Sequence, residues 1–413
     1  MERFTALAQR AKAASRLLAQ TDAETRKRAL RLQSELTEED IRLVLDANRA
    51  DLDAAEPTLD AVRRRIMTLR EADLRQLPPL MLEMAGRTDL LGQQVCEKHI
   101  EEGLELRRCM VPLGVVALLY EARPTVAWEA FALCLRTANA LILRCSPYDI
   151  RTTEALVALF RRRLAQAGLP EDAVQCAAGG TREDTYALFR MERYVDAGIV
   201  RGNHGTLRDM KREATIPLAV CGPGNCHIFI DESADPRMAE DILISSKVDR
   251  PLACNAAETL LVHERWAERH LAQLLKTLRE RGLTFAGDAR AAAYGEMDAA
   301  TEEDWTYEYF APRLAVAIVP DIGCAIDHIN RYRTPHTECI LTEDTAHAAR
   351  FFREVECNAC VHNAATRLID GGVFGFGTEM GISTGKLPWC GPIAARQLVQ
   401  ERFFLSGHGN VRH

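Results

Sequence analysis

The feature that most constrains the fold is a regular alternation of short apolar runs with amphipathic stretches of helical periodicity. The apolar runs have the length of strands, and they occupy residues 112–120, 140–143, 194–200, 217–220, 227–230, 259–262, 314–319 and 338–341. The helical patterns that alternate with them cover residues 127–136, 149–167, 236–248, 264–281 and 345–354. Strands separated by helices are typical of parallel sheets. We therefore predict an α/β fold.

The length bounds the number of domains. At roughly 100–200 residues per domain, a chain of 413 residues predicts about two or three domains. The first hundred residues have a helical pattern, and the strand-like texture begins at Val111. A turn-rich stretch at residues 231–236 is the expected boundary between two α/β lobes.

The composition excludes several classes of protein. With 47% hydrophobic and 27% charged residues, the chain resembles an ordinary globular protein. Its formal charge of -7 gives no basic surface for nucleic acid, so we expect no nucleic-acid partner. No apolar stretch approaches the ~18 residues of a membrane span, and the N-terminal segment lacks the apolar region of a signal peptide. A mitochondrial presequence is a weaker alternative, because Glu2 is acidic.

The chain has 13 cysteines, scattered from Cys96 to Cys390. An odd, scattered set does not fit a secreted disulfide framework, so we predict a reducing compartment and a cytoplasmic location. Most of these thiols are expected to pack as small apolar residues. Composition does not indicate which of them is reactive.

One cysteine lies in a place that suits a nucleophile. Cys254 and its neighbour Asn255 follow a polar turn and precede the apolar strand at 259–262. Loops held by a rigid sheet often carry reactive groups. Lys247 and Arg250, which are close in sequence, would favour the thiolate form electrostatically. A catalytic role and a packing role both remain open for Cys254 on this evidence.

The other motifs are less informative. Cys357-Asn-Ala-Cys360 has the spacing of a redox pair or of half a zinc site, but no second pair stands at a suitable distance, so we interpret both as packing thiols. The glycine loops at 201–205, 222–224 and 370–377 contain no complete dinucleotide or phosphate-loop motif. His328 and His336 are weakly placed as ligands. We predict no metal site.

Taken together and in order, these segments resemble the gamma-glutamyl phosphate reductase family, a branch of the aldehyde dehydrogenase superfamily. The resemblance extends over nearly the whole chain. It is carried by Val111-Pro-Leu-Gly-Val115, Tyr120-Glu-Ala-Arg-Pro124, Gly168-Leu-Pro170, Cys226-His-Ile-Phe-Ile-Asp-Glu-Ser233, Arg250-Pro-x-x-Cys-Asn-x-x-Glu-Thr-Leu-Leu-Val262, Asn363-Ala-x-Thr-Arg367, Asp370-Gly-Gly-x-Phe-Gly-x-Gly377 and Ser383-Thr-x-Lys-Leu387.

The resemblance implies an enzyme that reduces an acyl phosphate to an aldehyde with NADPH and releases phosphate. Cys254 matches the family's nucleophile, which would form a thioester able to accept hydride. The backbone N–H of Cys254 would stabilise the oxyanion. Hydrolytic aldehyde dehydrogenases carry a glutamate base whose matching position falls near Cys221, where this chain has no carboxylate. A thioester that is not hydrolysed remains available for reduction.

The resemblance also implies roles for individual residues. The catalytic set is Cys254, Thr125 and Asn255. The cofactor-binding set is Glu121, Arg144, Ser146, Gly202 and Glu308, with Glu308 matching the glutamate that binds the nicotinamide ribose. The substrate-binding set is Arg123, His227, Arg250, Arg367 and Lys386. Arginine and lysine in the last set would neutralise phosphate or carboxylate.

The chain departs from the family at four points, which lie mainly around the cofactor. Thr125 replaces the asparagine that donates to the oxyanion, and Cys145-Ser-Pro-Tyr148 replaces Gly-Gly-Lys-Glu. The lysine missing at Pro147 normally contacts the adenosine ribose or its 2′-phosphate, so NADH remains an alternative to NADPH. Asn203 replaces a glycine that approaches the cofactor. Cys390 replaces an arginine.

The resemblance predicts a Rossmann-like cofactor domain at residues 1–93 and 114–232 and a catalytic domain at 233–385. Residues 94–113 and 386–413 would form an oligomerisation flap, giving a homodimer or homotetramer. Two alternatives remain open. One is a sister reductase of another acyl phosphate or thioester, and the other is a catalytically weakened homologue that acts as a binding subunit.

Overall fold

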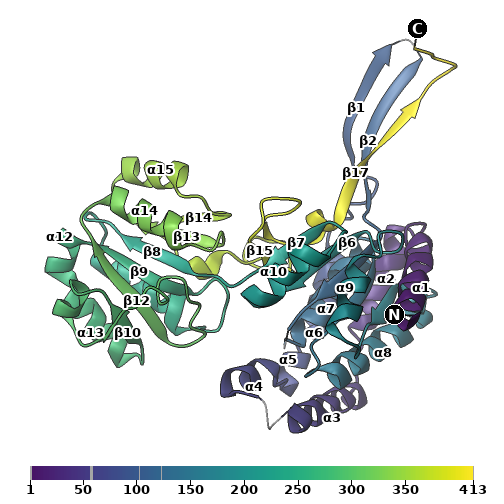
Figure 1. The fold of residues 1–413 in the computed structure, drawn as a ribbon. Coiled ribbons are helices and arrows are strands. Elements are labelled where there is room, and N and C mark those ends of the chain that lie inside the picture. The colour runs from purple at the N-terminus through teal and green to yellow at the C-terminus, as the bar shows by residue number, and fades with distance from the viewer. Residues whose placement is uncertain (1, 56–58, 102, 122, 413) are drawn as a thin grey trace. The chain divides into compact units, whose positions relative to one another are not determined.

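The computed structural model describes residues 2–55, 59–101, 103–121 and 123–412. They form two compact units (Figure 1). Unit 1 comprises Met1–Val220, Gly375–Gly381 and Ile393–His413, and unit 2 comprises Cys221–Phe374 and Ile382–Pro392. Unit 2 is therefore inserted into the sequence of unit 1. No helix of the described residues is long and apolar enough to cross a membrane.

Unit 1 contains a five-stranded sheet in the order β5-β4-β3-β6-β7. The strands are β3 (Val115–Leu119), β4 (Ala140–Arg144), β5 (Val174–Cys176), β6 (Ala197–Arg201) and β7 (Leu218–Cys221). Strand β3 pairs in parallel with both β4 and β6. Counted within the sheet, the order is 3-2-1-4-5, which matches five of the six strands of the doubly wound nucleotide-binding order 3-2-1-4-5-6. Its topological switch point lies between β3 and β6.

Helices cover both faces of this sheet because its central strands are buried on both sides. The helices of unit 1 are α1 (Glu2–Leu18), α2 (Ala23–Gln33), α3 (Glu38–Ala55), α4 (Ala61–Met67), α5 (Glu71–Leu74), α6 (Leu77–Gly86), α7 (Thr125–Arg136), α8 (Ile150–Gln166), α9 (Arg182–Phe189) and α10 (His204–Glu213). The apolar stripe of α1, with Phe4 and Leu7, packs against alternate residues of β3 such as Val115 and Ala117. The helical N-terminal region of the prediction thus extends to Gly86.

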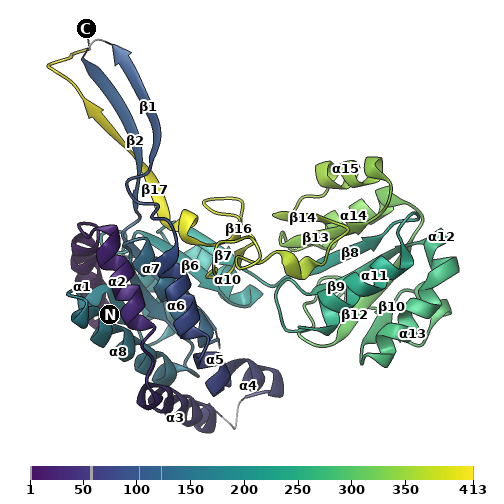
Figure 2. The ribbon, with the colours of Figure 1, turned by 180° about the vertical axis from the view of Figure 1, so that it is seen from behind.

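Three long strands extend away from the five-stranded sheet in both views (Figures 1 and 2). They are β1 (Gln94–Glu101), β2 (Leu104–Pro112) and β17 (Val399–Ser406), and they pair antiparallel in the order β1-β2-β17. The prediction of a helical first hundred residues is wrong for β1. Its sequence mixes charged and apolar residues and contains no apolar run. The strand is held by antiparallel pairing with β2.

Unit 2 contains a seven-stranded sheet in the order β11-β10-β12-β9-β8-β13-β14, and every pair is parallel. The strands are β8 (Cys226–Ile230), β9 (Ala257–His263), β10 (Thr284–Gly287), β11 (Asp298–Ala299), β12 (Arg313–Val319), β13 (Thr337–Leu341) and β14 (Ala359–His362). A short antiparallel pair, β15 (Ile382–Ser383) and β16 (Gly391–Pro392), belongs to the same unit. The α/β prediction is confirmed.

The two faces of the unit 2 sheet carry separate cores. Ile228 and Ile230 of β8 belong to one core, and Phe229 between them belongs to the other. Helices α11 (Pro236–Leu243), α12 (Glu264–Trp266) and α13 (Ala272–Glu280) contribute to the first, and α14 (Ile322–Tyr332) and α15 (Thr345–Glu354) to the second. The chain takes a π-helical form at Ile244–Val248, directly after α11, and again at Ala267–Leu271.

The division into units differs from the predicted domain boundaries. The sequence placed the boundary after residue 232, but β8 pairs with β9 and β13 and so belongs to unit 2. Residues 386–392 were assigned to the flap, yet β16 pairs with β15 in unit 2. The turn-rich stretch at residues 231–236 follows the end of β8. The chain passes from one sheet to the next earlier, between β7 and β8.

Candidate active site

The switch point of the unit 1 sheet brings together two of the predicted cofactor-binding residues. Glu121 follows β3, and Gly202 follows β6, its neighbour in the sheet. Thr206 Oγ1 donates to Glu121 Oε1 at 2.9 Å, which ties the two loops together. A Cβ on Gly202 would lie 3.1 Å from Thr206 and 3.3 Å from Glu121 Oε1. The loop is therefore closely packed at the place where open α/β sheets bind nucleotides.

Asn203 has a clear local role. Its side chain accepts a hydrogen bond from Thr206 N at 3.0 Å and caps the N-terminus of α10. The extra side chain at this departure from the family pattern is thus directed toward its own helix. The N-terminus of α10, next to Gly202, is the kind of helix end that suits a nucleotide phosphate. These residues fit a dinucleotide.

Arg144 and Ser146, at the end of β4, have internal partners. Arg144 donates to Thr185 Oγ1 at 2.9 Å and to the carbonyl oxygens of Cys145 and Ala177. Both Arg144 and Ser146 are buried, and burial lowers the pKa of Arg144. Their geometry within unit 1 fits a role in shaping the end of the strand rather than direct contact with a ligand.

In unit 2, Cys254 lies in the loop that enters β9 and is partly exposed. A Cβ on Gly224 would collide with the carbonyl oxygen of Cys254, so only glycine fits there. The thiol of Cys226 contacts the same carbonyl oxygen at 3.5 Å. The turn before β8 thus supports the backbone of the proposed nucleophile, a contribution that sequence reasoning missed.

Asn255 is held from the opposite side by the segment after β14. Its amide donates to Ile369 O at 2.9 Å, and its side-chain oxygen accepts from Arg367. Thr366 Oγ1 donates to the carbonyl oxygen of Asn255 at 2.6 Å, and Thr366 N donates to Ser246 Oγ at 3.1 Å. Asn255 is 2% exposed. Its contacts describe a residue that fixes the loop, and they place Arg367 beside that loop.

Glu308 connects to the same loop through the backbone. Gly224 N donates to Glu308 Oε2 at 3.2 Å, and Gly224 packs on Cys254. The side chain of Asn225 donates to the carbonyl oxygen of Trp305, near Glu308 in the sequence. The predicted ribose-binding glutamate and the predicted nucleophile are therefore joined by one glycine within unit 2.

A buried ion pair closes the base of the Cys254 loop. Lys247 lies in the π-helical turn before the loop, and Glu258 lies in β9 after it. Their Nζ and Oε2 atoms are 2.6 Å apart, and Tyr309 N also donates to Glu258 Oε2 at 3.3 Å. The expectation that Lys247 favours the Cys254 thiolate is wrong, because its charge is paired with Glu258 and wholly buried.

His227 does not fit its predicted role in binding substrate. Its side chain is wholly buried, and its Nδ1 lies 2.9 Å from Glu338 Oε2. Burial lowers the pKa of His227 to about 3 and raises the pKa of Glu338 well above its usual value. The two form a neutral hydrogen-bonded pair in the middle of the sheet.

The remaining predicted residues are more accessible. Arg250 is exposed in the turn before Cys254, and Lys386 is exposed with its Nζ 4.0 Å from Glu356 Oε2. Arg123 and Thr125 are partly exposed in unit 1, and Thr125 begins α7. Each remains a prediction. Across the described ranges, no group of three or more His, Cys, Asp or Glu residues is arranged to hold a metal ion.

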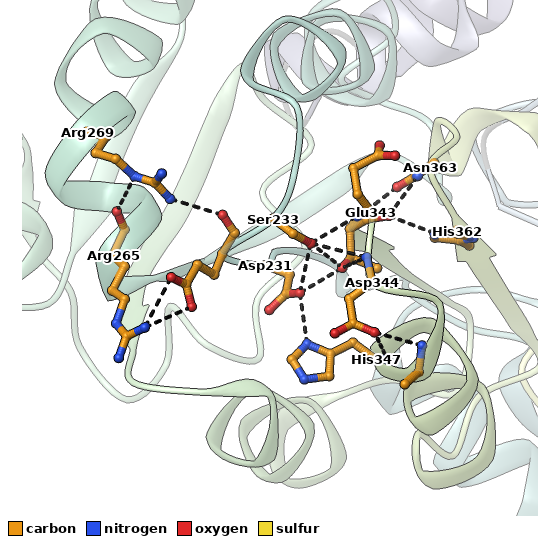
Figure 3. A network of polar contacts seen from close by, with 12 residues as sticks. Asp231, Ser233, Arg265, Arg269, Glu343, Asp344, His347, His362 and Asn363 are labelled. Carbon is orange, nitrogen blue, oxygen red and sulfur yellow. Dashed lines mark hydrogen bonds and ion pairs between the residues drawn. The ribbon is translucent and has the colours of Figure 1, made fainter.

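A second polar network lies at the carboxyl ends of β8, β13 and β14 (Figure 3). Asp231 Oδ2 accepts from Thr342 Oγ1 at 2.7 Å and lies 2.9 Å from His347 Nδ1. Ser233 contacts Asp231 and Thr342, whereas the histidine contacts the aspartate, so this is not the serine–histidine relay of a hydrolase. Asn363 joins the network through Thr342 and anchors the segment that continues to Thr366 and Arg367.

Comparison with known proteins supports the same interpretation. The profile of the aldehyde dehydrogenase family matches residues 2–293. A gamma-glutamyl phosphate reductase of Geobacillus kaustophilus is 39% identical over 407 residues, covering 98% of each chain. One of Bacillus cereus is 39% identical over 415 residues and covers 100% of both.

Solved structures extend the likeness to three dimensions. The crystal structure of gamma-glutamyl phosphate reductase from Thermotoga maritima has a TM-score of 0.93 and 32% identity, covering 99% of this chain and 100% of that one. Identity at this level over the full length, together with a shared fold, establishes common descent. The chain belongs to the aldehyde dehydrogenase family and, within it, to the gamma-glutamyl phosphate reductases.

Proposed function

We propose that the chain reduces L-glutamate 5-phosphate to L-glutamate 5-semialdehyde, releases phosphate and serves proline biosynthesis. The observation that carries the proposal is the full-length likeness to gamma-glutamyl phosphate reductases, combined with a partly exposed Cys254 on a rigidly held loop. Family membership implies a nicotinamide cofactor.

Each group in and around the Cys254 loop has one proposed role in the reaction. The Cys254 thiolate attacks the acyl carbon, the bond to the phosphate oxygen breaks, and phosphate leaves a thioester on the sulfur. A dihydronicotinamide cofactor, held by residues such as Gly202 and Glu308, would supply the hydride that reduces this thioester, and breakage of the C–S bond would release the aldehyde and return the Cys254 thiolate. Thr366, Asn255 and Gly224 hold the loop still, so that little reorganisation accompanies attack. Arg367 and Lys386 are the proposed partners of the substrate's phosphate or carboxylate.

NADPH is the proposed cofactor, with NADH as the alternative. The capped start of α10 beside Gly202 suits the diphosphate, and the position of Pro147 lacks the family lysine that would favour a 2′-phosphate. Parallel titrations with NADPH and NADH, followed by tryptophan fluorescence, decide between them. If neither nucleotide binds, the reductase assignment fails and the binding-subunit alternative is favoured.

The reaction is tested in reverse with glutamate semialdehyde, phosphate and the oxidised nucleotide. Cys254→Ala should abolish nucleotide reduction, whereas Cys324→Ala should not, because Cys324 is an exposed cysteine at the start of α14. Activity that survives Cys254→Ala would remove the proposed nucleophile. Turnover with another acyl phosphate or thioester, but not with this substrate, would favour the sister reductase.

We propose a homo-oligomer, a dimer or tetramer, that forms through the three-stranded sheet of unit 1. Large apolar side chains are exposed on β17, with Phe403 at 64% and Leu405 at 60%, and Val95 of β1 is at 41%. Light scattering should show that Phe403→Asp dissociates the assembly while the helical signal is retained. We propose a cytoplasmic location, which is consistent with 13 free cysteines in the structure.

A further inference from the structure

Two cysteines outside the Cys254 loop lie in direct contact. Cys357 precedes β14 and Cys360 belongs to it, and their Sγ atoms are 3.2 Å apart. The thiol of Cys357 also contacts the carbonyl oxygen of Ala359 at 3.2 Å. Both side chains are partly exposed at the edge of the sheet, where they pack against one of the two cores of unit 2. The two sulfur atoms are therefore adjacent, and they belong to residues that are partly exposed.

The contact makes the two thiols unequal. The hydrogen bond from Cys357 lowers the pKa of Cys360, and the same bond raises the pKa of Cys357. The thiolate is the form of cysteine that reacts with oxidants. The lowered pKa favours Cys360 as the sulfur that reacts first, and the 3.2 Å contact between the sulfur atoms places Cys357 to attack it in turn.

The residues on either side of Cys357 hold the segment that carries Lys386. The amide of Asn358 donates to Ser383 O at 2.7 Å and to Gly385 O at 3.0 Å. Glu356 pairs with Arg333 at 2.6 Å and lies 4.0 Å from Lys386 Nζ. The hydrogen bonds of Asn358 therefore connect the backbone next to Cys357 with residues 383–385.

We propose that Cys357 and Cys360 are an oxidative modification site, in which a peroxide converts the two thiols into a reversible disulfide that shifts the Lys386 segment. The Cys360 thiolate attacks one peroxide oxygen, the O–O bond breaks, and a sulfenic acid and one water form after protonation. The Cys357 sulfur then attacks the Cys360 sulfur, the S–O bond breaks, and a second water leaves. Two thiols lose two electrons and two protons, and one peroxide gains them.

Disulfide formation requires the chain to move. The sulfur atoms must approach from 3.2 Å to a bond of about 2.05 Å. Asn358 lies between the two cysteines in the sequence, so we expect this approach to strain its two hydrogen bonds to Ser383 O and Gly385 O. We expect the shift of the Lys386 segment to lower the affinity for phosphate. This expectation rests on the proposed function, whereas the disulfide itself does not.

The chain offers a direct assay of the disulfide. Trypsin releases Glu354–Arg367 as one peptide whose only cysteines are Cys357 and Cys360. In a full-length Cys254→Ser chain, where the proposed nucleophile cannot interfere, hydrogen peroxide followed by N-ethylmaleimide should give this peptide two hydrogens lighter and without alkylation. Dithiothreitol should restore both alkylation sites. If the peptide remains doubly alkylated while exposed Cys324 is fully oxidised, the site is overturned.

Single variants test the order of the two steps. With Cys357→Ser, oxidation should stop at a sulfenic acid on Cys360 that a cyclic dione captures. With Cys360→Ser, the peptide should resist oxidation. The buried Cys339, which contacts Ala364 O at 3.4 Å, is the internal control and should stay reduced throughout. Capture on Cys357 instead of Cys360 would overturn the assignment of the first reacting sulfur.

Calorimetry of phosphate binding tests the link to Lys386. Oxidation of the Cys254→Ser chain should weaken phosphate binding severalfold, and the triple variant that also carries Cys357→Ser and Cys360→Ser should not respond. An oxidised chain with unchanged phosphate affinity would overturn the link. A reduced chain that binds neither phosphate nor nucleotide would instead count against the proposed function, and the peptide assay would still decide on the disulfide.

Discussion

The Nζ atom of Lys247 lies 2.6 Å from Oε2 of Glu258, and the two side chains are 0% and 1% exposed. One residue precedes the Cys254 loop and the other follows it, so the pair joins the two ends of that loop. Burial lowers the pKa of Lys247 and raises the pKa of Glu258 to about 8. Each group depends on the other, because neither is solvated.

Lys247→Met should therefore destabilise the chain strongly. Without Lys247, the buried carboxyl of Glu258 loses the partner that lowers its pKa and is left unpaired, and breaking a buried pair costs about 3–5 kcal/mol. The double variant Lys247→Met with Glu258→Leu should recover most of that loss, because it leaves no unpaired carboxyl behind. Urea unfolding of the three chains measures the difference. Equal instability of the single and double variants would show that packing, rather than charge pairing, dominates at this position.

Gly224→Ala should lower kcat and also weaken nucleotide binding, because Gly224 N donates to Glu308. The new Cβ would meet the carbonyl oxygen of Cys254, so the loop must shift. A displacement of about 1 Å in a catalytic group can cost about a hundredfold in rate. Gly295→Ala is the matched control, because its nearest contact would be an ordinary 3.5 Å. Unchanged turnover in Gly224→Ala would indicate that the loop yields easily.

Asn203→Ala should cost about 1 kcal/mol through loss of the α10 cap, whereas Asn203→Gly should cost only a few tenths. The glycine variant also restores the family residue beside Gly202. We expect it to bind nucleotide at least as tightly as the natural chain, because the backbone N–H groups are less shielded. Thermal unfolding and nucleotide titration together test this expectation, and weaker binding by the glycine variant would contradict it.

Asp149→Asn should stabilise the chain at neutral pH. Asp149 is wholly buried, and burial, with Cys145 and Asp51 nearby, raises its pKa well above the usual 3.8. The unfolded chain loses this proton near pH 3.8 while the folded chain keeps it, so stability falls as the pH rises above that value. The variant should be about 1–3 kcal/mol more stable at pH 7.

The same variant has a pH signature that a packing effect would lack. Its advantage should disappear below about pH 3.8, where the natural side chain is protonated in both states. Asp53→Asn, at an exposed position of α3, should show no advantage at either pH. Melting temperatures of the three chains across this range provide the measurement. An advantage that is independent of pH would point to packing.

The central strands were predictable because they are buried on both faces. The continuous apolar runs at β8, β9, β12 and β13 follow from that burial. Strand β1 was not predictable, because it is held by antiparallel pairing with β2 and its own side chains are mixed. Its sheet also needs β17 from the far end of the chain.

The candidate site was predictable where the residues stand together in the sequence. The polar turn before β9 indicated Cys254 as the candidate nucleophile without three-dimensional information, and that role stays a prediction. The true partner of Lys247 lies on the other side of the loop, and the support from Gly224 and Thr366 comes from distant segments. Contacts of this kind between distant segments form only when parallel strands bring the ends of several loops to one place.

The insertion of unit 2 into unit 1 sets an order of synthesis. Strand β17 completes the three-stranded sheet, yet it leaves the ribosome after the whole of unit 2. During that interval the backbone of β2 presents a long unpaired edge, with β1 on its other side. A nascent chain therefore passes through a stage in which unit 2 is fully synthesised while unit 1 still has an unpaired edge strand. This stage is where chaperones would be needed most.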